Sequence, residues 1–303
     1  MGFVLIKNLN TLSSWEVNEG VLMDTVEEIM TKNVIACAPA DTILDVQKLM
    51  VKNSINRVIV TAAENKPVGI ITQKDVVSFL LLDKSRRGIE EIKAEEVMSK
   101  NLITVKPTTA IPDIAKTMVK KKISSLAVVD DKGKLSGIVT KSDINTYFAY
   151  KGSKDYKVHD FMTPKPVTIG PSQPTFVAVY LMADHSISRV VVVDKEKKPV
   201  GIITLSDVTM LSNLLKPAKV LAEGKPLLVK DYFVQPKSVH LLTAGDIMTA
   251  HPMTVKKDAD LTAAARLMAR HSISGLPVTD NTGKLVGIVT LSDITRAAAS
   301  PKQ

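Results

Sequence analysis

The chain has 303 residues, of which 45% are hydrophobic and 23% charged, so it has the composition of a globular protein and the length of about two domains. No apolar run approaches the ~20 residues of a transmembrane helix, the start lacks a secretory signal, and the single cysteine, Cys37, excludes an intrachain disulfide. We therefore expect a cytoplasmic protein with no membrane contact. The net charge of +9 fits a solvated surface, a nucleic-acid surface or pockets for a phosphorylated small ligand, and the charge alone does not choose among them.

A short phrase, Gly-Ile-Ile/Val-Thr-x-x-Asp, occurs four times along the chain. Each copy follows two methionines at fixed distances, so that 45 residues always separate the first methionine from the final aspartate. A constant spacing of this kind indicates four copies of one structural unit. The anchor residues are Met30, Met98, Met162 and Met248, then Met50, Met118, Met182 and Met268, then Gly69, Gly137, Gly201 and Gly287, then Asp75, Asp143, Asp207 and Asp293.

In chain order, we expect an N-terminal extension over 1–23 and a first repeat over 24–84. The second and third repeats cover 92–152 and 156–215. A connection over 216–241 leads to the fourth repeat, over 242–303.

Every repeat has the same predicted order of elements, β-α-β-β-α. A short β-like run is followed by an amphipathic helix, which in the fourth repeat carries Leu261, Ala264, Ala265 and Met268 at helical spacing. A β-branched strand, a turn and the strand of the repeated phrase come next, and a second helix closes the unit. A glycine in the turns of repeats two and four suits the positive φ of a hairpin loop. The fold class is therefore α/β (α+β), and units of roughly 60 residues should pair because each alone buries too little surface.

The Thr-x-x-Asp end of the phrase has two interpretations. It is a helix capping box, in which the threonine and the aspartate satisfy backbone groups of the helix start. It also offers free N–H groups and a carboxylate, which suit a phosphate and a ribose diol. A serine precedes the aspartate in the last three repeats, as Ser142, Ser206 and Ser292, whereas repeat one has Lys74.

These residues carry a resemblance to a known family. The Ile/Val-Met-Thr/Ser order at the start of a unit, the run SISRVVVVD at 186–194 and the repeated phrase resemble CBS domains, named after cystathionine β-synthase. The resemblance covers about residues 24–298 and implies two pairs of repeats, each a pseudo-two-fold module that binds adenosine ligands between its repeats. Four such domains in one chain also resemble the γ subunit of AMP-activated protein kinase.

The resemblance implies the roles of the site residues. The aspartate holds ribose hydroxyls, the threonine or serine contacts phosphate, and a basic residue at the entry of the partner's middle strand binds phosphate. That entry position is Arg57 and Arg189 in repeats one and three, but Ser125 and Gly275 in repeats two and four. We therefore predict two stronger nucleotide sites, independent of each other because the modules are expected to be separate. Their residues are Arg57, Thr140, Lys141, Ser142 and Asp143 in one site, and Arg189, Thr290, Ser292 and Asp293 in the other.

Two further sites are expected to be weaker, because they lack the arginine. They comprise Thr72 and Asp75 in repeat one, and Thr204, Ser206 and Asp207 in repeat three. The alternative for either arginine is a surface ion pair. The five histidines show no metal-ligand spacing, and we predict that His185 and His271 lie at helix ends.

The predicted function is a non-catalytic sensor, with no metal and no catalytic cofactor, that binds AMP, ADP or ATP and signals to an unidentified regulated protein. Trp15, in the acidic N-terminal segment, is the candidate contact for that partner, and homodimerisation through the modules is left open. The alternatives are another adenosine ligand (S-adenosylmethionine, coenzyme A or a dinucleotide), a scaffold with vacant clefts, or a nucleic-acid-binding protein. The last is disfavoured because only 12 aromatic residues are present and none is interleaved with a basic stretch.

Overall fold

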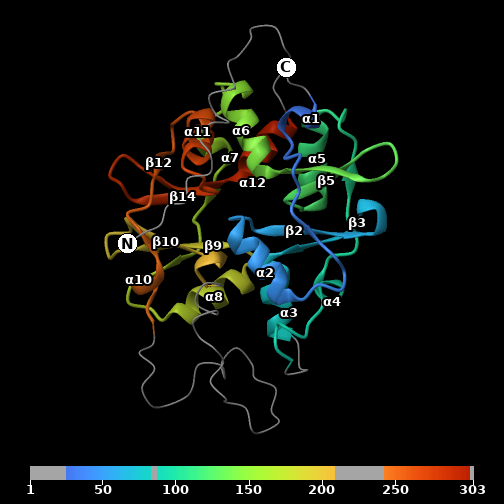
Figure 1. Cartoon of the computed structure of the whole chain (residues 1–303). Coiled ribbons are helices and arrows are strands. Elements are labelled where there is room, and N and C mark those ends of the chain that lie inside the picture. The colour runs from blue at the N-terminus through green and yellow to red at the C-terminus, as the bar shows by residue number, and fades with distance from the viewer. Residues whose placement is uncertain (1–24, 83–86, 209–241, 301–303) are drawn as a thin grey trace.

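The structure, a computed structural model, describes residues 25–82, 87–208 and 242–300. It is a mixed α/β fold with four small sheets, one in each repeat, and helices around them. In Figure 1 repeats one and two, coloured blue to green, lie beside repeats three and four, coloured yellow to red. The predicted α/β class and the β-α-β-β-α order are confirmed, with an additional one-turn helix at the start of each repeat.

The elements recur with nearly constant lengths. Repeat one comprises α1 (Val26–Ile29), β1 (Ala36–Cys37), α2 (Ile43–Lys52), β2 (Arg57–Ala62), η2 (Ala63–Asn65), β3 (Lys66–Thr72) and α3 (Gln73–Leu82). Repeat two comprises α4 (Ala94–Val97), β4 (Thr104–Val105), α5 (Ile111–Lys121), β5 (Ser125–Val129), β6 (Leu135–Thr140) and α6 (Lys141–Lys151). Repeat three comprises α7 (Val158–Phe161), β7 (Thr163–Pro164), β8 (Thr168–Ile169), α8 (Thr175–Asp184), β9 (Arg189–Val193) and β10 (Pro199–Thr204). Repeat four comprises α10 (Ala244–Ile247), β11 (Thr249–Ala250), β12 (Val255–Lys256), α11 (Leu261–Arg270), β13 (Gly275–Thr279), β14 (Leu285–Thr290) and α12 (Leu291–Ala299).

Local sequence explains these elements. The apolar residues predicted for the amphipathic helix of repeat four all lie buried on one face of α11. The turn glycines Gly133 and Gly283 adopt φ of 74° and 83°, as the hairpin interpretation requires. Repeats one and three place Asn65 and Lys197 at positive φ in the corresponding turns. In every sheet the short strand that precedes the amphipathic helix runs parallel to the middle strand, which pairs antiparallel with the strand of the repeated phrase. In the pair of repeats three and four, β11 and β7 each add antiparallel to the sheet of the partner repeat.

The repeats pair by exchanging their opening segments. Thr25, before α1, forms a β-bridge with Ala110 of repeat two, and Lys93, before α4, forms one with Thr42 of repeat one. Val26 of α1 is consequently buried in the core of repeat two. The opening residues of repeat two, which include Ile92 and Ala94, are buried in the core of repeat one. Neither repeat of a pair therefore completes its core alone.

The glycine of the repeated phrase contacts the first methionine of the partner repeat. A Cβ atom added to Gly137 would lie 2.5 Å from Met30 Sδ, and one added to Gly287 would lie 2.5 Å from Met162 Sδ. The reciprocal contacts join Gly69 to Met98 and Gly201 to Met248. Any side chain at these glycines would displace the methionine. The recurring methionine and glycine are therefore explained by their contact across each pair of repeats.

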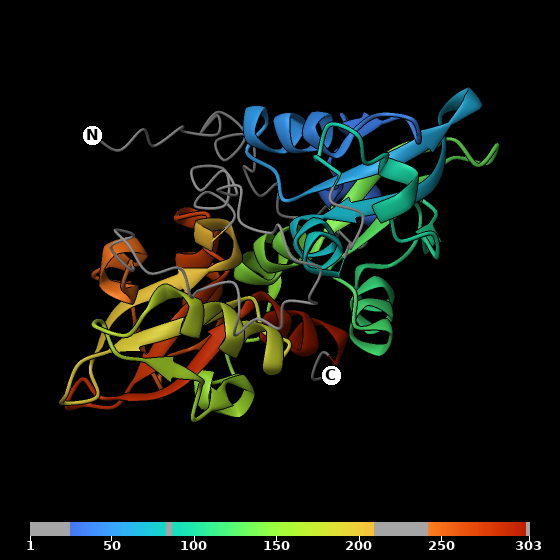
Figure 2. The same cartoon turned by 90° about the horizontal axis from the view of Figure 1, so that it is seen from below.

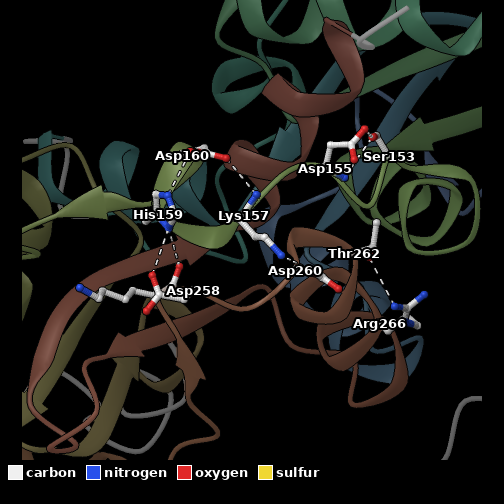
Figure 3. A network of polar contacts seen from close by, with 10 residues as sticks. Ser153, Asp155, Lys157, His159, Asp160, Asp258, Asp260, Thr262 and Arg266 are labelled. Atoms are coloured by element: carbon white, nitrogen blue, oxygen red, sulfur yellow. Dashed lines mark hydrogen bonds and ion pairs between the residues drawn. The ribbon is translucent and has the colours of Figure 1, made fainter.

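Repeats three and four are also joined by charged residues (Figure 3). Lys157 Nζ donates to Asp260 Oδ1 at 2.6 Å, across the bridge that joins the two repeats. His159 lies beside Asp160 of its own repeat, with Nε2 at 3.3 Å from Oδ1, and its Nδ1 is 3.1 Å from the carbonyl of Lys257 in repeat four. These contacts fix the one-turn helix α7 against its partner repeat.

The expectation that the two modules are separate is wrong. A single hydrophobic core contains residues of repeats two and four, including Ile144 and Phe148 of α6 together with Ala264 of α11 and Ala297 of α12. α6 packs on α11, and α12 packs on both α5 and α6. These four helices gather at one end of the molecule in Figure 1, whereas α2, α3 and α8 lie toward the other, and Figure 2 shows the two modules joined.

Candidate ligand sites

The repeated phrase forms a helix cap in all four repeats. In each, Oδ2 of the aspartate accepts from both the backbone N–H and the hydroxyl of the threonine. The backbone distances are 2.8 Å for Thr72–Asp75, 2.7 Å for Thr140–Asp143, 2.7 Å for Thr204–Asp207 and 2.6 Å for Thr290–Asp293. The capping interpretation is thus confirmed, and a ligand would have to use the second carboxylate oxygen and the remaining N–H groups of the helix start.

Each motif helix begins beside the entry of the middle strand of its own repeat. The N–H of the residue after the threonine donates to the carbonyl of the residue before that strand. In repeat two, Lys141 donates to Ser124 at 3.1 Å, and in repeat four, Leu291 donates to Ser274 at 3.2 Å. The first residue of the partner repeat's middle strand lies beside the same carbonyl. An arginine at that position can therefore contact the start of the motif helix.

Arg57 makes this contact between repeats one and two. Its Nη1 donates to the Ser124 carbonyl at 2.8 Å and lies 3.3 Å from the Ser124 hydroxyl. Burial lowers the pKa of Arg57, and the charge of Asp143 acts in the opposite direction. Arg57 therefore lies beside the start of the Thr140–Asp143 helix, and its contacts with Ser124 are not those of a surface ion pair.

Arg189 occupies the corresponding place between repeats three and four. Its guanidinium lies against Gly275, where an added Cβ would collide with Nη1. Burial lowers the pKa of Arg189 to about 10, and the charge of Asp293 opposes this shift. The absence of a side chain at Gly275 leaves the room that this guanidinium occupies.

The motif helices also meet across the two modules. Lys141 Nζ donates to the Ser292 hydroxyl at 2.9 Å, and the Ser206 hydroxyl donates to Gln73 Oε1 at 3.0 Å. Burial lowers the pKa of Lys141; Arg57 and Arg296 lower it further, while Asp293 raises it. Charges from repeats one and four therefore act on this lysine of repeat two, and the two arginine-bearing sites adjoin.

Repeat four contains one charged residue that the sequence analysis missed. Arg296, one helical turn after Asp293, places Nη2 at 2.8 Å from Asp293 Oδ1 and at 2.6 Å from the carbonyl of Phe161. The i, i+3 spacing of the two residues on a helix is the signal that would have found this pair. Burial raises the pKa of Asp293, although Thr290 and Arg296 both act to lower it.

The two sites predicted to be weaker differ from the others at the strand entry. The partner residue there is Ser125 for the Thr72–Asp75 helix and Gly275 for the Thr204–Asp207 helix, so neither receives an arginine from that position. The histidines follow the prediction for their place in the fold, because His185 and His271 are the C-cap residues of α8 and α11. Within the described ranges, no group of three or more potential metal ligands occurs and no helix is long and apolar enough to cross a membrane.

A comparison with protein families matches the CBS domain four times, over residues 26–82, 94–150, 158–212 and 244–300. The chain therefore belongs to the CBS-domain family, whose members are generally regulatory. The four matches confirm the resemblance that the repeated phrase carries.

The similar proteins include archaeal chains of comparable organisation. The uncharacterised protein MJ1404 of Methanocaldococcus jannaschii is 31% identical over 93% of this chain, which spans 64% of that protein. Protein MJ1225 of the same organism is 26% identical over 87% of this chain and 94% of its own length. Homoserine O-acetyltransferase of Methanococcus vannielii is 36% identical, but this chain spans only 27% of that enzyme.

Solved structures show the same fold. The crystal structure of MJ1225, described as a proposed archaeal homologue of γ-AMPK, superposes with a TM-score of 0.75 at 24% identity, covering 90% of this chain and 99% of that one. A conserved protein of Pyrococcus horikoshii gives a TM-score of 0.63 at 22% identity, with the same coverage of both chains. This chain therefore shares its fold with these two proteins.

Proposed function

We propose that this protein is a non-catalytic sensor that binds an adenine nucleotide, AMP, ADP or ATP, between its paired repeats. The observation that carries the proposal is the meeting of Arg57, Lys141 and the N-terminus of α6 beside the Ser124 carbonyl. Arg57 and Lys141 repel each other, and burial disfavours the charge of both. A phosphate bound there would relieve both effects, because it brings negative charge to two cations and a helix N-terminus.

The carboxylate beside this cationic group supports a nucleotide rather than a free phosphate. Asp143 uses Oδ2 in the helix cap, and a second carboxylate oxygen can accept from a ribose diol. Ser142 at the same helix start offers a hydroxyl and an N–H to a phosphate oxygen. The choice of adenine comes from membership of the CBS-domain family and from what that resemblance implies. The Arg189 site is the second proposed site, and those of repeats one and three are proposed to be weaker.

Calorimetric titration with AMP, ADP and ATP tests the proposal. A charge-assisted hydrogen bond contributes roughly 1.5–3 kcal/mol, so Arg57→Ala or Asp143→Ala should each weaken the repeat-two site by about ten- to a hundredfold. Asp45→Ala is the matched control, because Thr42 and Asp45 form the same capping box on α2, away from the repeated phrase. It should cost about 1 kcal/mol of stability and leave nucleotide affinity unchanged.

Several outcomes would change the assignment. Tighter binding of S-adenosylmethionine, coenzyme A or a dinucleotide would keep the site and change the ligand. Binding to RNA or single-stranded DNA that falls steeply with salt and competes with AMP would favour the nucleic-acid alternative. Sustained ATP turnover by the pure protein, abolished by Asp143→Ala, would contradict the non-catalytic role.

The signal itself is proposed to be a change in packing between repeats that a regulated protein recognises. The adjoining sites at the Lys141–Ser292 contact support this, because a ligand in either would act on the contact between the modules. The candidate partner contact at Trp15 lies outside the described residues. A cytoplasmic location and association of two chains stay predictions, which fractionation and sedimentation of the native protein test.

A further inference from the structure

The carboxylate of Asp293 has a donor on each of its oxygens. Oδ2 accepts from the Thr290 N–H and hydroxyl at 2.6 and 2.8 Å, and Oδ1 accepts from Arg296 at 2.8 Å. The Asp293 side chain is only 3% exposed, so few directions of approach to it remain. The Arg296 guanidinium therefore binds Asp293 Oδ1, the carboxylate oxygen that does not take part in the helix cap.

No other described motif helix has a cation at this position. The residue three after the aspartate is Ser78 in α3 and Thr146 in α6, and the Thr146 hydroxyl donates instead to the Ser142 carbonyl at 3.1 Å. The two arginine-bearing sites share the strand-entry arginine and the capping box, but they differ in the residue three positions after the aspartate.

Arg296 is held at a second point, by the Phe161 carbonyl of repeat three at 2.6 Å. Phe161 ends α7, and the next residue, Met162, packs against Gly287 in the strand before α12. The guanidinium thus ties the motif aspartate of repeat four to the exchanged segment of its partner. A ligand that displaces it from Asp293 would loosen one of these two attachments.

We propose that Arg296 is a specificity-determining residue that competes with a ribose diol for Asp293 and so weakens nucleoside binding at the repeat-four site. This inference rests on the proposed function and adds that a residue of α12 itself limits nucleoside binding at the repeat-four site. The competition is modest in size, because the Arg296 side chain is 46% exposed and water screens its charge. Removing it should strengthen binding of a diol at the repeat-four site by about three- to tenfold.

The test uses the uncharged nucleoside adenosine, so that loss of a positive charge does not weaken attraction to a phosphate. Adenosine and 2′,3′-dideoxyadenosine, which lacks the diol, are titrated by calorimetry into the full chain carrying Asp143→Ala, which weakens the repeat-two site. Adding Arg296→Gln should strengthen adenosine binding by about three- to tenfold and leave dideoxyadenosine binding unchanged. Arg270→Gln, on the exposed end of α11, removes the same charge in the same repeat and should change neither.

Each result supports or overturns the inference. Unchanged or weaker adenosine binding in Arg296→Gln, or equal strengthening of both nucleosides, overturns it while wild-type binding of AMP leaves the proposed function standing. Failure of the wild-type chain to bind AMP, ADP, ATP or adenosine overturns both. If Arg296→Gln lowers the melting temperature too far for calorimetry, Arg296→Lys serves instead. It loses the planar fork that reaches two acceptors and should give the same diol-dependent strengthening, smaller in size.

Discussion

Repeats two and four differ from repeats one and three in how their helices pack, although all four repeats have the same order of elements. The former share one hydrophobic core across the two modules, whereas repeats one and three have separate cores in the part of the chain that the structure describes. The outer faces of the helices explain the shared core. α6 presents Phe148 and Ala149, and α12 ends in three alanines that allow close approach. The repeated phrase therefore determines the fold of a single repeat, whereas the outer faces of α6 and α12 determine how the two modules pack together.

Two polar contacts fix the position of these helices in the shared core. Asn145 is buried on α6, and its amide donates to the Ala265 carbonyl of α11 at 3.0 Å. Arg266 of α11 donates to the Ala149 carbonyl at 3.1 Å. Because each bond joins a side chain to a backbone carbonyl of the other module, sliding of the helices would leave buried polar groups unpaired.

The largest effect expected from this comparison follows truncation of a buried methionine. Met118 lies in the shared core and Met50 occupies the same place in repeat one. Met118→Ala should cost about 2–5 kcal/mol and reduce hydrogen-exchange protection in α11 of the other module, because both modules bury residues in that core. Met50→Ala should cost a similar amount while leaving protection in α11 closer to wild type. Equal loss of protection in α11 from both variants would contradict the division into shared and separate cores.

A smaller effect is expected from a feature that all four repeats have in common. Gly69→Ala and Gly137→Ala each place a Cβ at 2.5 Å from the sulfur of a partner methionine, and each should cost about 1–3 kcal/mol through overpacking. Chemical denaturation measures both. Gly170→Ala is the control, since its nearest atom would lie at 3.6 Å, and it should stay within about 0.5 kcal/mol of wild type. A much larger cost at Gly137 than at Gly69 would mean that the shared core amplifies the damage.

Binding should distinguish the two contacts between modules. Lys141→Gln removes a cation next to Arg57, so we expect AMP affinity at the repeat-two site to fall by about tenfold. Gln73→Ala breaks the corresponding contact with Ser206 without changing charge and should leave affinity within about twofold. Equal weakening by both variants would assign the effect to loosened packing instead.

The same lysine gives the binding a pH dependence. The pKa of Lys141 is lowered, chiefly by burial, so it loses its charge at a lower pH than an ordinary lysine. AMP affinity of the wild type should therefore decline in the alkaline range as Lys141 deprotonates, and Lys141→Gln should lack that decline. Calorimetry across the alkaline range measures it. Persistence of the full decline in Lys141→Gln would assign it to another group.

The sequence was sufficient to predict the fold of each repeat and its helix cap, but not the packing of the two modules against each other. Fixed spacing predicted four repeats, and the Thr-x-x-Asp pattern predicted caps that all form, because both depend on residues close together in the chain. The entry position of the middle strand also placed Arg57 with the helix start of repeat two. The packing of the modules against each other was not predicted, because it depends on contacts such as that of Asn145 with Ala265, which are 120 residues apart in the chain. No local sequence pattern predicts a contact between residues so far apart. Arg296 was missed although its spacing from Asp293 is local, because its second contact, with Phe161, depends on the pairing of repeats.

The smallest expected effect concerns the native thiol of Cys37, whose labelling rate reports how readily the core of repeat one opens. Cys37 is buried there, and burial is the main cause that raises its pKa to about 11. At pH 8 about one thousandth of the thiol is therefore ionised, so a thiol reagent should label the native protein slowly, with a rate rising about tenfold for each pH unit. Met50→Ala should speed labelling by making that core easier to open, whereas Met118→Ala should leave the rate within about twofold of wild type. Equal acceleration by both would show that the cores open together, and a rate independent of pH would show that opening, rather than ionisation, limits the reaction.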